Sequence, residues 1–164
     1  MSETYADADL IDILRATRTI AMVGASPKWV RPSNFVMKYL QGKGYRVIPV
    51  NPAAAGQTIL GETVYGALTD VPEPFQMVDI FRNSAAAGPI VEEALALKEA
   101  RGIRNIWMQL TVVNDDAAAR ARAAGLSVVM DRCVKIEYGR LFGELGWGGI
   151  NTGVITSKRL KLRG

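Results

Sequence analysis

Short apolar runs alternate with amphipathic segments along most of the chain. The runs are four to six residues long and mostly apolar throughout, rather than at every second position. This pattern is typical of strands that are covered by helices on both faces of a sheet. The segments between the runs carry apolar residues at helical spacing. The predicted strands are 20–23, 45–50, 76–81, 105–110 and 126–131, and the predicted helices are about 6–17, 33–43, 86–101, a segment that Asn114 begins, and 134–141.

The alternation of strands and helices predicts the fold class. Strands separated by helices favour right-handed crossovers and therefore a parallel sheet. We expect an α/β fold, a Rossmann-like three-layer sandwich with a mostly parallel sheet of about five strands. The domain should span residues 1–142 and include an N-terminal helix. The remaining segment, 143–164, is interpreted as a Gly-rich C-terminal arm with a basic tail.

Three local features refine this prediction. Asn114 should cap a helix, because Asp115 and Asp116 then place negative charge in its first turn. Pro49 is unwelcome inside a central strand and is therefore placed at a strand end, where its missing N–H matters least. The connection before the third strand is punctuated by Gly and Pro, and it holds a possible short strand at Val64–Tyr65.

Length and composition set the class of protein. A chain of 164 residues with 49% hydrophobic content predicts one domain with a full core. We expect no membrane segment, because no apolar run reaches about 18 residues and the N-terminus does not have the pattern of a signal peptide. Cys133 is the only cysteine, which fits a reducing, cytoplasmic location. The absence of histidine excludes His-based triads and His metal sites.

The net charge of +4 is concentrated at the C-terminus. Four of the last seven residues are basic, so the tail alone supplies the excess. We interpret the tail as a solvated terminus, with a nucleic-acid contact or a packed tail as the alternative. The rest of the chain has no basic stripe interleaved with aromatic residues, so we expect no nucleic-acid partner.

The loop after the first strand, in AMVGASPKWVRPSNF, has features of a phosphate cradle. Gly24 allows a tight turn and a close approach of the backbone to phosphate. Lys28 and Arg31 add positive charge, and Pro32–Ser33 suits the start of a helix. An ordinary polar turn is the alternative.

The same region argues against a nicotinamide dinucleotide. The fingerprint G-x-G-x-x-G would need three glycines where the chain has Gly24, Ser26 and Trp29. An NAD site also usually carries an acid at the end of the second strand, where this chain has Asn51 and Pro52. Ligands in such sheets bind at the carboxyl ends of the strands, so the segments expected to converge are 24–33, 51–52, 81–83, 109–110 and 131–133.

Several separated motifs together resemble a known family. In chain order they are VGASPKWVRPS, YRVIPVNP, ILGETVYGALTDVPEPFQMVDIFR, WMQLTVVN and AGLSVVMDRCVKIEYGRL, and the resemblance covers about residues 10–142. They closely resemble the small stand-alone coenzyme A (CoA)-binding proteins, relatives of the CoA-binding domain in the α subunit of succinyl-CoA synthetase. The resemblance implies a Rossmann-like domain that binds CoA or an acyl-CoA through its nucleotide. The synthetases need a further domain with a phosphorylated histidine, so this chain is not expected to run their reaction.

The resemblance also implies where CoA is held. CoA carries a diphosphate and a 3′-phosphate, so the site needs cations, and an arginine can bind phosphate through two hydrogen bonds. From its place near a strand end, Gln109 could reach a ligand carbonyl, with a structural amide as the alternative. The expected CoA-binding residues are Gly24, Ala25, Ser26, Arg31, Pro32 and Ser33 for the diphosphate, with Lys28 as a further cation; Asn51, Pro52, Phe81 and Arg82 for the adenosine end, with Arg82 available for a phosphate; and Gln109 and Cys133.

Two further side chains leave alternatives open. Cys133 lies beside Arg132 and near a helix start, a position that favours the thiolate, and our hypothesis is a mixed disulfide with the CoA thiol or a response to oxidation. The alternative for Cys133 is a buried small hydrophobe. Asp79, inside an apolar strand, is either hydrogen-bonded to a neighbouring loop or faces the ligand.

The function predicted from these features is binding without catalysis. The pattern contains no convincing acid–base pair or nucleophile–base pair. We therefore expect a non-catalytic CoA- or acyl-CoA-binding protein that acts as a carrier, sensor or regulator. The alternative is an NAD(P)-binding redox regulator or a small acyl-CoA-using enzyme. A homodimer, formed through an apolar helix face or the C-terminal arm, is left open.

Overall fold

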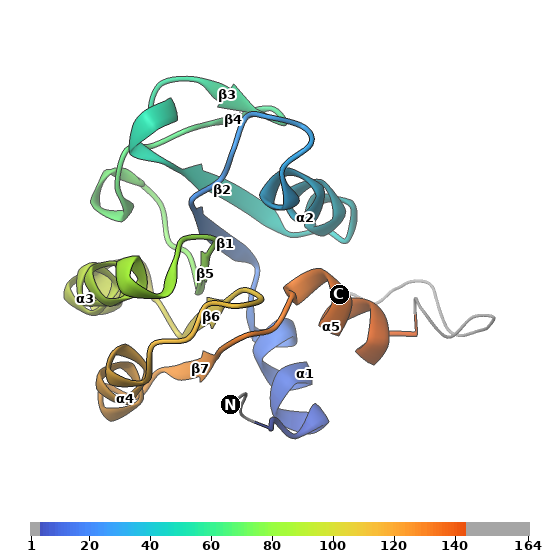
Figure 1. Ribbon diagram of the computed structural model, residues 1–164, viewed down its shortest axis with the longest axis vertical. Coiled ribbons are helices and arrows are strands. Elements are labelled where there is room, and N and C mark those ends of the chain that lie inside the picture. Colours follow the sequence, from blue (N-terminus) through green and yellow to red (C-terminus); the bar gives the residue numbers. More distant parts are fainter. Residues whose placement is uncertain (1–3, 144–164) are drawn as a thin grey trace.

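The computed structural model describes residues 4–143 and shows one parallel sheet between two layers of helices (Figure 1). The strand order is β2-β1-β5-β6-β7, and every pairing within this sheet is parallel. The predicted three-layer α/β sandwich of five strands is confirmed. The predicted Gly-rich arm and basic tail lie outside the described residues, apart from Gly143. The strands are β1 (Thr19–Val23), β2 (Arg46–Val50), β5 (Met77–Ile80), β6 (Asn105–Met108) and β7 (Ser127–Val129).

The helices divide between the two faces of the sheet (Figure 1). One face is covered by α1 (Asp7–Ala16), α2 (Pro32–Gly42) and α5 (Val134–Leu141), and the other by α3 (Ser84–Arg101) and α4 (Asp115–Ala123). These bounds agree with the predicted helices to within about two residues. No helix among the described residues combines the length and apolar character needed to cross a membrane.

The strands supply both cores because their side chains alternate between the faces. In β1, Ile20 and Met22 belong to the cluster under α1, α2 and α5, whereas Ala21 and Val23 belong to the cluster under α3 and α4. Trp107 of β6 is fully buried, and its indole N–H donates to the Arg132 carbonyl at 2.9 Å. Burial on both faces explains why the strand sequences are apolar at almost every position.

One local prediction is confirmed and a second is corrected. The Asn114 side chain accepts from the Ala117 N–H at 3.0 Å and so caps α4. Pro49 lies inside β2, one residue before its end, and is tolerated because β2 is an edge strand. The Val50 carbonyl faces β1, where it accepts from Gly24, while the Pro49 carbonyl faces outward and accepts from Tyr65. The missing N–H therefore points away from the ladder with β1.

The predicted short strand at Val64–Tyr65 is wrong. A two-stranded antiparallel hairpin stands just before it, formed by β3 (Thr58–Ile59) and β4 (Glu62–Thr63). Tyr65 makes only an isolated parallel bridge to Val50. The prediction rested on the apolar character of Val64 and Tyr65. The turn of the hairpin lies earlier in the chain, at Leu60 and Gly61, which both have a positive φ.

Candidate functional site

The site is built where the strand order reverses. The chain runs from β1 to β2 on one side and then crosses back to β5 on the other side of β1. The loops after β1 and β5 therefore meet at the carboxyl edge of the sheet, which is where ligands bind in open parallel sheets.

Gly24 makes this meeting possible. It has a φ of +92°, and a Cβ placed on it would lie 2.7 Å from the Phe81 carbonyl oxygen and 3.0 Å from the Arg82 Cδ. Its N–H donates to the Val50 carbonyl, while the Phe81 N–H donates to the Val23 carbonyl, both at 2.8 Å. A side chain at this position would force β1 and β5 apart at the edge that forms the site.

The β1–α2 loop is held by hydrogen bonds among its own residues. The Ser33 hydroxyl accepts from the Ser26 N–H at 3.0 Å, and the Ser26 hydroxyl accepts from the Lys28 N–H at 3.1 Å. Asn34 donates to the Ser26 carbonyl at 3.1 Å, and Asn51 donates to the Ala25 carbonyl at 2.8 Å. The side-chain Oδ1 of Asn51 accepts from the Ala53 N–H at 2.9 Å, so both ends of this carboxamide are hydrogen-bonded.

A cavity of about 560 Å³ lies against this loop, and we refer to it as the loop cavity. Lys28 and Arg31 are exposed charges on its wall, and no carboxylate lines it. Within residues 4–143, neither cation is recorded in an ion pair. Pro32 and Ser33 place the positive end of the α2 dipole at the same wall, so the cavity suits an anion. Its lining residues are Gly24, Ser26, Pro27, Lys28, Arg31, Pro32, Ser33, Asn51, Ala53, Ala54, Gln57 and Phe81.

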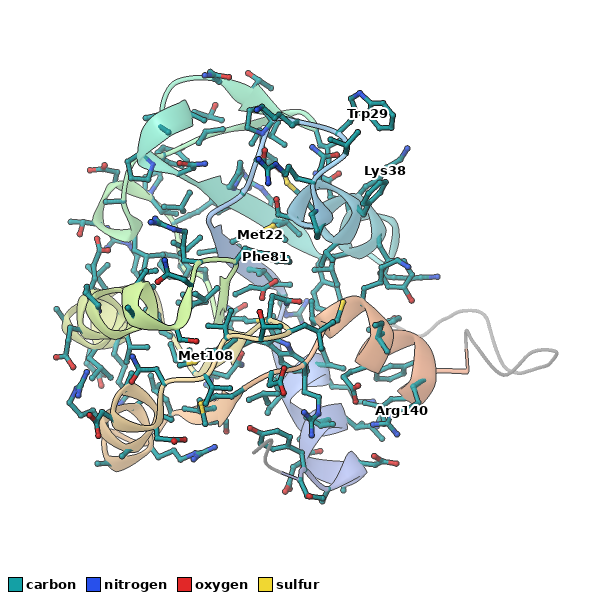
Figure 2. The ribbon with its side chains drawn as sticks, viewed as in Figure 1. Met22, Trp29, Lys38, Phe81, Met108 and Arg140 are labelled. Atoms are coloured by element: carbon teal, nitrogen blue, oxygen red, sulfur yellow. The ribbon has the colours of Figure 1, made fainter. Side chains whose placement is uncertain are left out.

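A second cavity, of about 410 Å³, continues along the same edge, and we refer to it as the strand-end cavity. It shares Pro32 and Phe81 with the loop cavity, so the two are neighbours. Figure 2 shows Phe81 near the middle of the molecule, between the α2 region and β6. Arg82 is its one charged lining residue, and most of the remaining wall is apolar or uncharged. Its lining residues are Pro32, Val36, Phe81, Arg82, Asn83, Gln109, Leu110, Thr111, Val112 and Cys133.

Most of the predicted site residues come together in these two cavities. Two do not: Ala25 is 1% exposed and lines neither cavity, and Pro52 begins a short 3₁₀ turn that also stays outside both. Arg82 was placed with Asn51 at the adenosine end, but the structure separates them, with Asn51 in the loop cavity and Arg82 in the strand-end cavity. Trp29, which stands where the dinucleotide fingerprint would have a glycine, is 74% exposed and projects outward (Figure 2).

Sequence reasoning missed several lining residues. Gln57 reaches the loop cavity from the connection after β2, and Val36 reaches the strand-end cavity from the buried side of α2. Thr111 enters that cavity at a φ of +71°, with its N–H donating to the Asp131 carboxylate at 2.7 Å. No local pattern marks Gln57 or Val36, because each reaches a cavity only through the packing of its element.

A buried carboxyl lies beneath the strand-end cavity. Asp79 is 0% exposed, and its Oδ1 accepts from Gln109 Nε2 at 2.6 Å. The loop alternative for Asp79 is therefore the correct one, since Gln109 directly follows β6. Burial raises the pKa of Asp79 to about 7, and the hydrogen bond from Gln109 opposes part of that rise.

A larger cavity, of about 740 Å³, lies at the opposite edge of the sheet, where β6 and β7 begin. Its wall mixes acids and bases, and one such pair, Lys98 and Glu99, stands 3.5 Å apart. It carries neither the convergent backbone turn nor the unpaired cations of the loop cavity. We place the ligand site at the carboxyl edge for this reason and because of the strand-order reversal.

Known proteins share this sequence and fold. A family model described as CoA binding domain matches residues 18–139. The uncharacterized protein YneT of Bacillus subtilis (strain 168) is 32% identical over 131 residues, which are 80% of this chain and 93% of YneT. A hypothetical protein from Pyrococcus horikoshii OT3 is 38% identical in its solved structure, with a TM-score of 0.77 over 87% of this chain and all of that one.

A more distant likeness connects the fold to a large synthetase. The dinucleotide-forming acetyl-coenzyme A synthetase 1 of Ca. Korarchaeum cryptofilum has a TM-score of 0.57 and 20% identity, over 71% of this chain and 27% of that chain. This likeness shows a shared fold within part of the larger protein. Together with the family match over residues 18–139, the comparisons establish that the chain belongs to the CoA-binding domain family.

Proposed function

We propose that the protein binds coenzyme A across the two neighbouring cavities and does not transform it. The loop cavity would hold the phosphates and adenosine, and the strand-end cavity would hold the pantetheine arm. One observation supports this proposal above the others: the two cavities, which meet at Pro32 and Phe81, have walls of different chemistry. Among the described residues, the wall of the loop cavity carries cations and no carboxylate, whereas the wall of the strand-end cavity is largely uncharged.

The charge distribution of CoA supports this orientation. Its nucleotide end carries the diphosphate and the 3′-phosphate, whereas its pantetheine arm is neutral and has amides and a terminal thiol. Lys28 and Arg31, which have no ion-pair partner within residues 4–143, match the phosphates, since charge-assisted hydrogen bonds to phosphate are among the strongest in proteins. Arg82 packs its Cδ over Gly24 and is placed to serve a phosphate near the boundary between the cavities.

The groups at the cavity walls support a role as carrier, sensor or regulator. Among the described residues neither wall contains a carboxylate, and the chain has no histidine, so these walls do not offer the usual general bases. Asp79, whose pKa would suit a general base, is fully buried and reaches the cavity only through Gln109. These features support binding without chemistry over an acyl-CoA-using enzyme.

Calorimetric titration of nucleotide-free protein with CoA, acetyl-CoA, dephospho-CoA, NAD and NADP tests the proposal. We expect CoA to bind more tightly than dephospho-CoA, and both to bind more tightly than NAD or NADP. Equal affinity for CoA and acetyl-CoA would leave the free or acylated form of the natural ligand undetermined. Tight binding of NAD or NADP without CoA binding would contradict the proposal and favour the redox-regulator alternative.

A further inference from the structure

The buried carboxyl of Asp79 has one hydrogen-bond partner and one oxygen without any. Met77, two residues earlier on β5, belongs to the core under α2 and α5, so Asp79 faces the same side. Its register neighbours are Met22 on β1 and Trp107 on β6, both fully buried. Gln109 Nε2 donates to Oδ1, while Oδ2 has no partner among the described residues. Oδ2 is therefore a buried polar atom without a partner in the described chain, and such an atom needs an explanation.

The charge state of Asp79 is set by its burial. The pKa of Asp79 is raised to about 7 by burial, the Gln109 hydrogen bond lowers it, and no charged group contributes. The facing positions of β1 and β6 are apolar. The titratable side chains on the covering helices are Asp7, Asp9, Asp12 and Arg15 of α1, Lys38 and Tyr39 of α2, Cys133 just before α5, and Lys135, Glu137, Tyr138 and Arg140 of α5. Asp79 therefore changes charge near neutral pH, mainly in response to what happens at Gln109 and in the cavity above it.

Gln109 connects this carboxyl to the strand-end cavity. Its backbone N–H donates to the Ile80 carbonyl at 3.2 Å, which ties it to the end of β5. Its side chain is 5% exposed and lines the cavity beside Cys133 and Val36. An ionised carboxylate can only accept, so it holds the Gln109 amide with Nε2 toward Asp79 and leaves Oε1 for the cavity. A protonated carboxyl can donate to Oε1 instead, and the amide then turns Nε2 toward the cavity.

We propose that Asp79 and Gln109 form a proton-coupled pair that decides whether the strand-end cavity offers its ligand a hydrogen-bond acceptor or a donor. The inference rests on the proposed function, in which the pantetheine arm occupies this cavity. In the arrangement observed, Gln109 Nε2 donates to Oδ1 at 2.6 Å, which is the orientation that an ionised Asp79 requires. In this state Gln109 Oε1 accepts from an N–H of a pantetheine amide. Gln109 is thereby a specificity residue, and Asp79 is the residue that positions it.

The coupling gives CoA binding a defined dependence on pH. The bound amide N–H favours ionised Asp79, so binding lowers the pKa of Asp79 and releases a proton. Affinity is then highest above about pH 7 and falls as the pH drops below it. One neutral hydrogen bond is worth about 1 kcal/mol, which corresponds to an affinity about fivefold weaker near pH 6 than near pH 8.

Dephospho-CoA is the appropriate probe, because its diphosphate diester does not titrate between these pH values. We would measure its affinity near pH 6 and pH 8, and the protons released near pH 7 in two buffers that differ in ionisation enthalpy. The comparison uses wild type, Asp79→Asn and, as a control, Asp70→Asn at a remote site. We expect the fivefold difference and proton release in wild type and Asp70→Asn, and neither in Asp79→Asn.

Two results would overturn the inference in distinguishable ways. Dephospho-CoA binding in wild type that is independent of pH and releases no proton would contradict the coupling while leaving the proposed function intact. Failure of dephospho-CoA and CoA to bind at either pH would contradict the proposed function as well. If Asp79→Asn does not fold, the proton release measured for wild type still tests whether binding is coupled to the ionisation of Asp79.

Discussion

The loop cavity and the strand-end cavity lie side by side at one edge of the sheet, yet they are made in different ways. The loop cavity is formed by a turn whose own hydrogen bonds fix the backbone, and Lys28 and Arg31 project from it without an ion-pair partner in the described chain. The strand-end cavity is formed where strand ends and helices pack together, and its polar contact comes from Gln109, which is tied to a buried acid.

This difference explains how one edge of a sheet could recognise a ligand with two unlike ends. Phosphate groups are best bound at an exposed turn that presents both cations and the positive end of a helix dipole. A neutral arm is best met by apolar packing with a few placed polar groups. Variants that act on one cavity and not on the other test whether the two cavities bind different ends of the ligand.

Gly24→Ala should have the largest effect, because Gly24 belongs to the turn on which both cavities depend. The new Cβ would meet the Phe81 carbonyl at 2.7 Å in addition to the unfavourable positive φ. We expect CoA affinity to fall more than 100-fold, and stability to fall by about 3 kcal/mol, as measured by calorimetry and denaturant unfolding. Gly44→Ala is the matched control, since Gly44 has a φ of +97° and open space around it. Equal losses in the two variants would show that the close approach at Gly24 is unimportant.

Asp79→Asn should stabilise the free protein at alkaline pH. Asp79 has a pKa of about 7 when folded and about 4 when unfolded, so the folded state holds its proton more tightly. The stabilisation that Asp79 contributes to the folded state is therefore complete below about pH 4. It falls by about 1.4 kcal/mol for each pH unit from there to about pH 7, where it is lost. We expect the Asn variant to be more stable than wild type by about 4 kcal/mol near pH 8 and equally stable near pH 4. Unfolding midpoints that differ by the same amount at both pH values would exclude this titration.

Removing both cations from the loop cavity should weaken CoA binding strongly. For Lys28→Ala combined with Arg31→Ala we expect about a 50-fold loss, because each charged hydrogen bond is worth about 1.5 kcal/mol or a little less when exposed. The salt dependence of binding should also become shallower in this variant. Lys38→Ala is the control, since Lys38 is exposed on α2 and lines neither cavity (Figure 2). A loss of similar size in Lys38→Ala would point to a general charge effect.

Leu110→Asp should act on the strand-end cavity alone. Leu110 is 54% exposed at the rim, and a carboxylate there would disfavour the neutral arm without disturbing the core. We expect CoA affinity to fall about fivefold and the affinity for ADP, which lacks the arm, to stay within about twofold. Ile136→Asp, at a 47% exposed site that lines neither cavity, is the control. A fall in ADP affinity equal to that in CoA affinity would contradict the assignment of the two ends.

The smallest effect concerns Cys133, which lines the strand-end cavity and is partly exposed. If the pantetheine thiol reaches this cavity, CoA disulfide should exchange with Cys133. The Cys133 thiolate attacks one sulfur, a protein–CoA disulfide forms, and the second CoA leaves as its thiolate. Mass spectrometry should detect one CoA adduct in wild type and none in Cys133→Ser, with little change in affinity. Absence of an adduct in wild type would sink the mixed-disulfide hypothesis.

From the amino-acid sequence we could predict the parallel sheet, the succession of strands and helices along the chain, and the turn at Gly24. Apolar runs, helical spacing, the Asn114 cap and the absence of an acid after β2 are local signals, and each acts through the few residues around it. Other features became visible in the folded protein alone. Arg82 and Asn51 line different cavities, and Gln57 and Val36 reach cavity walls. Asp79 pairs with Gln109, 30 residues away in the chain. Such pairings arise because neighbouring strands bring distant residues into contact, and no periodicity along the chain records which side chains will then meet.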